Sequence, residues 1–149
     1  MQSFRLKASI LAMSLILISI FMHILSPANK LDVRFYYSVI EAQEFFNRLS
    51  IQEIRRYFFG ELFDLFFILN YSALSFLLFR SYFSKKEKWV LFLPGLIDVV
   101  ETGSILLKLK GHQISLFLLS LSTLAKWSSG VLVLVFLLYK VLQSRRIDA

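Results

Sequence analysis

Five acidic or basic side chains lie within long apolar stretches of this sequence, where an ionisable group is energetically costly and points to a specific role. Glu61 and Asp64 are three residues apart, and so are Asp98 and Glu101. In a helix this spacing places both carboxyl groups of a pair on one face. Lys126 lies in a later apolar stretch. Such groups can form ion pairs, carry protons or act as general acid and base, so these five residues are the candidates for any chemistry.

Lys126 has the best-defined candidate partners. It lies near the middle of its apolar stretch, as Asp98 and Glu101 do in theirs. The two stretches are joined by a short connection, which makes their helices antiparallel neighbours. We therefore expect Lys126 to pair with Asp98 or Glu101.

The other acidic pair needs different partners. Glu61 and Asp64 lie towards one end of their stretch, one to two helical turns from Arg55 and Arg56. His23 closes the first apolar stretch. We expect one or both carboxyl groups to pair with these arginines or with His23.

The four carboxyl groups outnumber the single lysine. A carboxyl group that is buried alone prefers the neutral form, so we expect at least one of the four to be protonated or to bind a cation. Oxygen ligands suit Mg, Ca or Mn, but neither His23 nor His112 completes the Glu-x-x-His pattern of di-iron bundles. The sequence has no Cys, nucleophilic triad or glycine-rich phosphate loop, and we predict no metal site and no cofactor.

Four apolar segments must position these residues. The chain has 149 residues, of which 57% are hydrophobic, 16% aromatic and only 18% charged. This composition is typical of an integral membrane protein, and the net charge of +7 fits Lys and Arg near lipid headgroups better than a nucleic-acid partner. We predict an all-α, four-span transmembrane helix bundle with its polar stripes inward, and a kink at Pro94 in the third span. The single membrane domain covers 1–149, with spans at about 8–25, 57–80, 89–108 and 113–139.

The loop before the second span carries an amphipathic segment at about 38–56. Two Ser-x-x-Glu sequences, beginning at Ser38 and Ser50, match the capping box at a helix start. We expect a short helix that rests on the membrane surface or, as the favoured interpretation, caps the bundle as a packing lid. It is followed by one helix that runs from about 51 to 80 without a break. The buried face of the short helix is predicted to hold Val39, Ala42, Phe46 and Leu49.

The basic residues predict the orientation and the location. Lys and Arg are slightly more numerous on the side that holds both termini, which favours cytoplasmic termini in a bacterial inner membrane. Lys85, Lys86 and Lys88 cluster in a short loop on that side and are expected to contact anionic lipid headgroups. The apolar core of the first segment is longer than that of a signal peptide, so we expect an uncleaved helix.

Parts of the chain resemble a group of small, uncharacterised bacterial four-helix membrane proteins. Their landmarks are an Arg–aromatic entry to the second helix, Asp-x-x-Phe-Pro-x-x-Tyr within it, and Asp-x-x-Glu-Asn in the third. Here these read Arg56-Tyr57, Asp64-Leu65-Phe66-Phe67-Ile68-Leu69-Asn70-Tyr71 and Asp98-Val99-Val100-Glu101-Thr102, with Ile68 in place of Pro and Thr102 in place of Asn. The resemblance covers about half of the chain. It implies a four-span bundle in which Asp64, Tyr71, Asp98 and Glu101 work as a set.

Two functions follow from the intramembrane Asp/Glu/Lys set. The first is a structural or accessory role, in which the ion pairs fix the register of the helices and the bundle joins a second copy or a membrane complex. The alternative is a proton- or cation-linked transporter, or a membrane-embedded acid–base enzyme, that uses the same groups. A dry, fully paired interior favours the first function, and a water-filled cavity reaching Lys126 favours the second.

Overall fold

The computed structural model describes residues 2–25, 30–31 and 33–147, and within them the chain forms helices and no strand. Four of these helices are long and apolar enough to span a membrane, which agrees with the predicted all-α, four-span bundle. The α-helices are α1 (Gln2–Leu25), α2 (Val39–Arg48), α3 (Ile51–Phe79), α4 (Leu93–Leu109) and α5 (Leu116–Ile147). Two short 3-10 helices, η1 (Arg80–Tyr82) and η2 (Glu87–Phe92), lie between α3 and α4.

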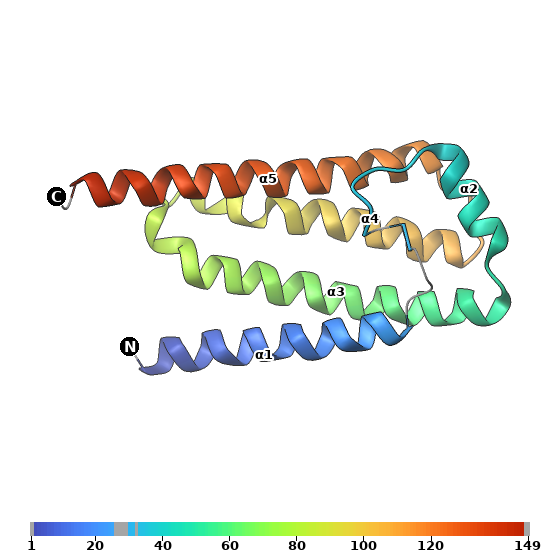
Figure 1. Cartoon of the computed structure of the whole chain (residues 1–149), viewed down its shortest axis with the longest axis horizontal. Coiled ribbons are helices and arrows are strands. Elements are labelled where there is room, and N and C mark those ends of the chain that lie inside the picture. The colour runs from blue at the N-terminus through green and yellow to red at the C-terminus, as the bar shows by residue number, and fades with distance from the viewer. Residues whose placement is uncertain (1, 26–29, 32, 148–149) are drawn as a thin grey trace.

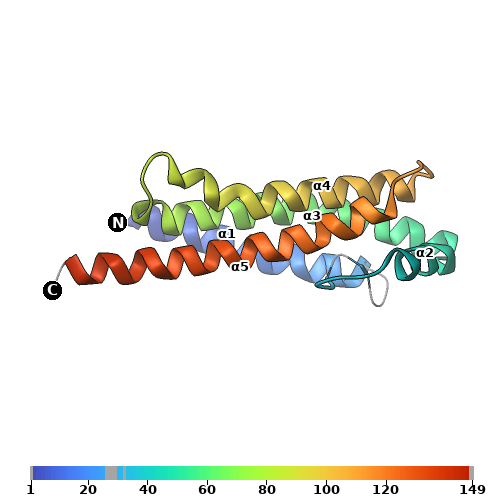
Figure 2. The same ribbon diagram turned by 90° about the horizontal axis from the view of Figure 1, so that it is seen from above.

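The four long helices run up and down in chain order (Figure 1). Both ends of the chain and the α3–α4 connection lie at one end of the bundle, and α2 lies at the other end with the α4–α5 turn. α1 packs against α3, α3 against α4, and α4 against α5 (Figure 2). Each carboxyl-bearing helix therefore has the next helix of the chain as its neighbour.

Both predicted capping boxes are present. At the start of α2, Ser38 N–H donates to the Glu41 carboxylate at 2.7 Å and Glu41 N–H donates to the Ser38 hydroxyl at 3.2 Å. The bond from the Ser38 backbone holds the pKa of Glu41 below its ordinary value, and the Ser38 side chain adds to this effect. Ser50 and Glu53 form the same box, and α3 then continues unbroken to Phe79.

The buried face of α2 differs from the predicted one. Ala42 is buried as predicted, and Phe46 and Leu49 are half-buried against the core. Val39, in contrast, is 40% exposed, and Phe45, which lies outside the predicted face, is buried. The ring of Phe45 packs edge-on against Tyr57 of α3, with ring centres 5.7 Å apart. Because the partner Tyr57 belongs to another helix, this contact places Phe45 on the buried face of α2.

Pro94 does not kink an α-helix. α4 begins at Leu93, so Pro94 lies in the first helical turn and the preceding stretch is the 3-10 helix η2. At this position the missing N–H of proline costs little, because first-turn N–H groups have no partner within the helix. Gly95 then allows close contact between α4 and α3: a Cβ atom on Gly95 would lie 2.3 Å from Ser72 Oγ.

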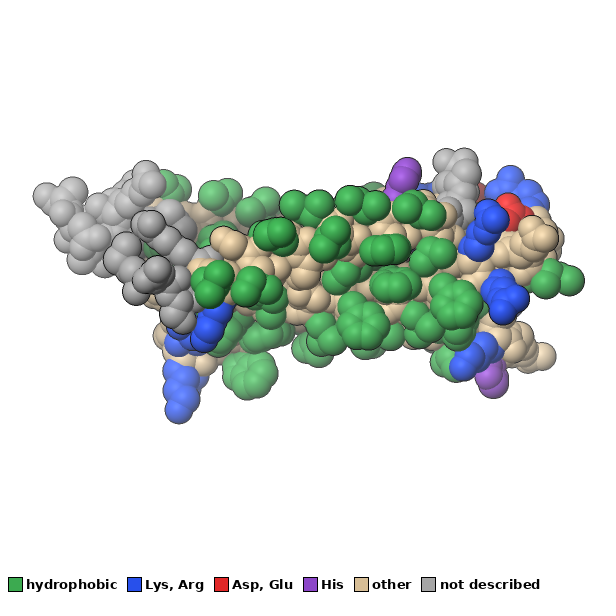
Figure 3. All heavy atoms as spheres, turned by 90° about the horizontal axis from the view of Figure 1, so that it is seen from below, with side chains coloured by type: hydrophobic (Ala, Val, Ile, Leu, Met, Phe, Trp, Pro, Cys, Tyr) green, Lys and Arg blue, Asp and Glu red, His purple; other side chains and the backbone are tan. Residues whose placement is uncertain are grey.

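The surface of the molecule is divided along its length. Figure 3 shows hydrophobic side chains over the middle of the face in view and Lys and Arg side chains near both ends. Many large apolar side chains of α1 and α5 are exposed, including Ile16, Leu17, Leu132 and Leu134. An apolar middle with basic ends is the surface of an integral membrane protein, in which lipid covers the apolar band.

Candidate functional site

Lys126 of α5 lies between the two carboxyl groups of α4. Its Nζ atom is 3.1 Å from Asp98 Oδ1 and 2.5 Å from Glu101 Oε2. The structure thus forms both of the pairings that the sequence allowed for Lys126. The three-residue spacing of the acids lets one ammonium group bridge them, and the bridge ties α4 to α5.

Hydroxyl groups extend this bridge in both directions. On one side Tyr71 of α3 donates to Asp98 Oδ2 at 3.1 Å. On the other side the hydroxyl of Thr123 donates to Glu101 Oε1 and lies 3.1 Å from the Tyr37 hydroxyl. The result is a continuous chain of polar contacts, called the Lys126 network below, that consists of Tyr71, Asp98, Lys126, Glu101, Thr123 and Tyr37.

Burial varies along the Lys126 network. Glu101 and Thr123 are 0% exposed and Tyr37 is 1% exposed. The side chains of Asp98 and Lys126 retain 12% and 13% of their exposure. Because charge is costly to bury without partners, both carboxylates of the network, Asp98 and Glu101, have an ammonium and a hydroxyl contact.

The second acidic pair has different partners from those predicted. Glu61 Oε1 lies 3.9 Å from the Nζ atom of Lys30, which is itself buried. Asp64 Oδ2 accepts a hydrogen bond of 2.8 Å from Thr102 of α4. These contacts lie towards the α2 end of the bundle and join α3 to α4 and to the loop that follows α1.

The predicted partners of Glu61 and Asp64 lie elsewhere. The side chains of Arg55, Arg56 and His23 are exposed. Glu61 and Asp64 face the interior of the bundle, whereas the arginines lie on the outer faces of the first turns of α3. His23 is on the exposed face of α1, so its predicted place among the buried polar residues is wrong.

The segment 33–38 explains how a loop residue reaches the Lys126 network. It runs back along α5, where Trp127 Nε1–H donates to the Arg34 carbonyl at 2.8 Å and Ser120 donates to the Tyr37 carbonyl. Trp127 is eleven residues, or about 16 Å of helix, from the start of α5, within the apolar span Leu116–Lys140. Irregular backbone beside an apolar span needs protein partners for its carbonyl groups, and α5 supplies them for Arg34 and Tyr37.

Sequence reasoning missed several residues of these contacts, among them Lys30, Tyr37, Ser120 and Thr123. Thr123 carried a usable signal, because it precedes Lys126 by three residues and therefore shares its helix face. Lys30 and Tyr37 belong to a loop with no hydrophobic period, so nothing local to them predicts burial.

The arrangement joins segments more directly than it offers a site for a ligand. The carboxyl groups are divided among separate lysine and hydroxyl partners. In the part of the chain that the structure describes, no three His, Asp or Glu side chains are grouped as metal ligands.

A comparison of the chain with protein-family models, curated proteins and solved structures gives no match.

Proposed function

We propose that this chain is a structural or accessory membrane protein in which the Lys126 network locks the helices in register. The observation that carries the proposal is the continuity of the contacts: one lysine and its neighbours join α3, α4, α5 and the segment 33–38. A buried ion pair adds little net stability once its desolvation cost is counted, and in some proteins such groups fix a unique arrangement. We propose that role here, because it suits a part that must present a fixed shape. The partner is a second copy of the chain or another subunit of a membrane complex.

The proposed location is a bacterial inner membrane with both termini on the cytoplasmic side. Supporting this orientation, the exposed Lys85 and Lys86 and the half-buried Lys88 lie in the α3–α4 connection, at the same end as both termini. Positive charge favours the cytoplasmic side of short loops. These lysines are also placed to contact anionic headgroups.

A second candidate function is proton- or cation-linked transport, or acid–base catalysis, at the same residues. The observation in its favour is that Asp98 and Lys126 retain partial exposure while hydroxyl groups continue the contacts on both sides. A proton could then enter at Asp98 or Lys126 and pass along the network.

The test removes charge from the network in two ways. Lys126→Met leaves two carboxyl groups in the bundle without their ammonium partner, and we expect it to cost about 3–5 kcal/mol and most of the folded protein. The triple variant Asp98→Asn, Glu101→Gln, Lys126→Met keeps the shape without any charge, and we expect it to fold nearly as well as the wild type. Thermal unfolding of the detergent-solubilised protein measures both effects.

Lys140→Met is the matched control. Lys140 also pairs with a carboxylate, Glu87 at 2.7 Å, but this pair lies at the periphery with 20% and 31% of the side chains exposed. Its loss should lower the unfolding temperature far less than loss of Lys126. If Lys126→Met instead folds like the wild type and abolishes proton uptake into proteoliposomes, the structural proposal is wrong and the transport function is supported.

A further inference from the structure

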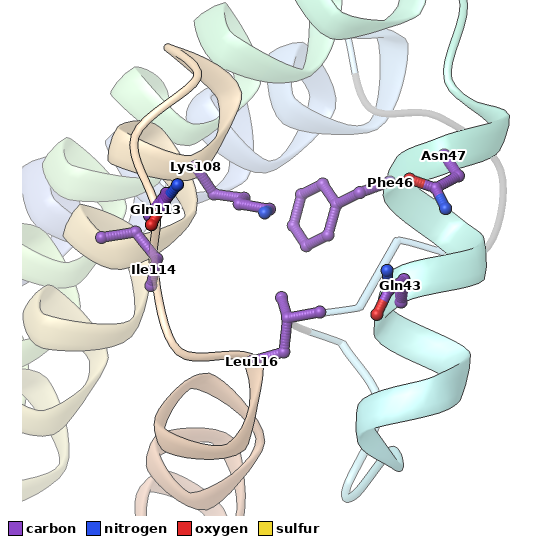
Figure 4. A pocket seen from close by; sticks show the side chains of 7 residues that line it. All are labelled: Gln43, Phe46, Asn47, Lys108, Gln113, Ile114 and Leu116. Carbon is purple, nitrogen blue, oxygen red and sulfur yellow. The ribbon is translucent and has the colours of Figure 1, made fainter.

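A cavity of about 250 Å³ lies at the end of the bundle away from the termini, where α2 faces the α4–α5 turn (Figure 4). It is separate from the Lys126 network. The carboxamides of Gln43 and Asn47 approach it from α2, and that of Gln113 approaches from the turn. Lys108 of α4 extends across it towards the ring of Phe46, and Leu116 closes the apolar part of the wall.

The lining has the chemistry of an anion site. It contains one cation, three carboxamides that can donate hydrogen bonds, and no carboxylate. Lys108 forms no ion pair with any carboxylate among the described residues. The neighbouring Lys110 instead lies over the ring of Phe58, 5.4 Å from its centre, and does not line the cavity. The amine of Lys108 is therefore the charge that the cavity offers to a ligand.

Size and position narrow the ligand class. A volume of 250 Å³ is that of about eight water molecules, which is enough for a phosphate with a short polyol. It is smaller than the pockets that usually hold drug-sized ligands. Lys108 and Leu116 lie at the ends of the apolar spans Glu87–Leu109 and Leu116–Lys140, which places the cavity at the level of the headgroups. The apolar wall beside the cation suits a molecule with a charged head and an apolar tail.

We infer that this cavity binds a phosphate ester anion, with the headgroup of an anionic phospholipid as the source that its position favours. Lys108 provides the charge, the three carboxamides provide directed hydrogen bonds, and Phe46 and Leu116 contact the first carbons of the lipid. The inference does not depend on the function proposed for the Lys126 network.

The experiment uses the full chain in a neutral detergent with dihexanoyl phosphatidylglycerol as the probe. We expect saturable binding in a titration calorimeter, and weaker binding of dihexanoyl phosphatidylcholine, whose headgroup adds a cation. Lys108→Gln should weaken phosphatidylglycerol binding by at least about tenfold, because a charge-assisted contact is lost. Lys110→Gln makes the same change of charge two residues away, outside the lining, and should change the affinity by less than about twofold.

Gln113→Leu gives a second measurement that leaves the charge of the protein unchanged. It removes one carboxamide from an exposed turn residue, and we expect the affinity for phosphatidylglycerol to fall by about threefold or more with an unaltered circular dichroism spectrum.

Competition separates the two sources of phosphate. Inorganic phosphate or glycerol 3-phosphate displaces the probe at similar concentrations if the ligand is a free phosphate, and fails to do so if it is a lipid. Equal losses in the two lysine variants, equal binding of the two lipids, or no saturable binding would each overturn the inference.

Discussion

Thr123 shows how a single hydroxyl group can connect distant parts of this chain. Its oxygen contacts the buried carboxylate of Glu101 on α4 and the hydroxyl of Tyr37 in the loop before α2. All three side chains are buried, so none of them can exchange its partner for bulk water. Thr123 is therefore important for stability because, without its hydroxyl, the Glu101 carboxylate and the Tyr37 hydroxyl would stay buried and lose this contact.

Replacing Thr123 by Val tests this role. Valine keeps the shape of threonine but leaves Glu101 Oε1 and the Tyr37 hydroxyl without their common partner, so we expect a loss of about 1–2 kcal/mol in unfolding free energy. Thr123→Ser keeps the hydroxyl and removes only a methyl group, and it should cost less than Thr123→Val. Unfolding in detergent, followed by tryptophan fluorescence, compares the two. A greater loss for Ser than for Val would show that packing, and not the hydroxyl, is what matters at this position.

The contacts of the two lysines, Lys126 and Lys30, differ in how far they could be predicted from sequence. The contacts of Lys126 with Asp98 and Glu101 follow from helical spacing and from a short connection, which are both local properties. The contact of Lys30 with Glu61 was not predictable, because it depends on where an irregular loop returns after leaving α1. Partners of buried charges on regular elements can be inferred from period and depth, whereas partners that arrive from loops need the tertiary structure.

Close contact between α3 and α4 depends on the glycine near the start of α4. The position where Gly95 would carry a Cβ atom is 2.3 Å from Ser72 Oγ and 3.5 Å from the Tyr71 hydroxyl. Because glycine has only a hydrogen atom in place of a side chain, α3 and α4 can approach each other more closely here than a methyl group would allow. Since Tyr71 also reaches Asp98, the spacing of these two helices affects the Lys126 network.

Gly95→Ala should therefore destabilise the bundle, by about 1–3 kcal/mol, through overpacking against Ser72. Ser72→Ala in the same chain removes the obstructing oxygen, and the double variant should recover most of the lost stability. Gly103→Ala is the control on the same helix: no atom lies within 4 Å of its Cβ position, so it should gain about 0.5–1 kcal/mol from helix propensity. Unfolding temperatures of the four proteins settle the point, and equal effects at Gly95 and Gly103 would contradict it.

Element boundaries were the most predictable part of the structure, and the reasons are physical. The two capping boxes fixed the starts of α2 and α3, because Ser and Glu satisfy N–H groups that a helix end leaves open. Pro94 was placed in the right stretch but given the wrong effect, because the sequence does not show that α-helical geometry begins at Leu93. Likewise, the period of α2 could not reveal that Tyr57 would draw Phe45 inward.

The whole molecule combines a regular up-and-down bundle with a segment that re-enters it. The α3–α4 connection lies at the end that holds the termini, and the α4–α5 turn lies at the other end (Figure 1). The segment 33–38 runs along α5, and Phe35 within it is 56% exposed although its neighbour Arg34 accepts a bond from Trp127. Because this segment lies beside the apolar span Leu116–Lys140, we expect the exposed Phe35 ring to contact lipid.

Single cysteines test this arrangement, and the natural sequence contains none that would interfere. Ser84 and His112 are exposed, the first in the α3–α4 connection and the second in the α4–α5 turn. In intact cells a membrane-impermeant maleimide should label His112→Cys directly but Ser84→Cys only after permeabilisation, because the two positions lie on opposite sides and the basic connection lies inside. Phe35→Cys should resist the reagent in both states, because lipid surrounds it, and should react once the protein is unfolded in dodecyl sulfate.

Labelling of Ser84→Cys from outside would reverse the proposed orientation. Labelling of both loops from the same side would contradict the four-span topology, and rapid labelling of Phe35→Cys in the membrane would show that the segment 33–38 lies in water.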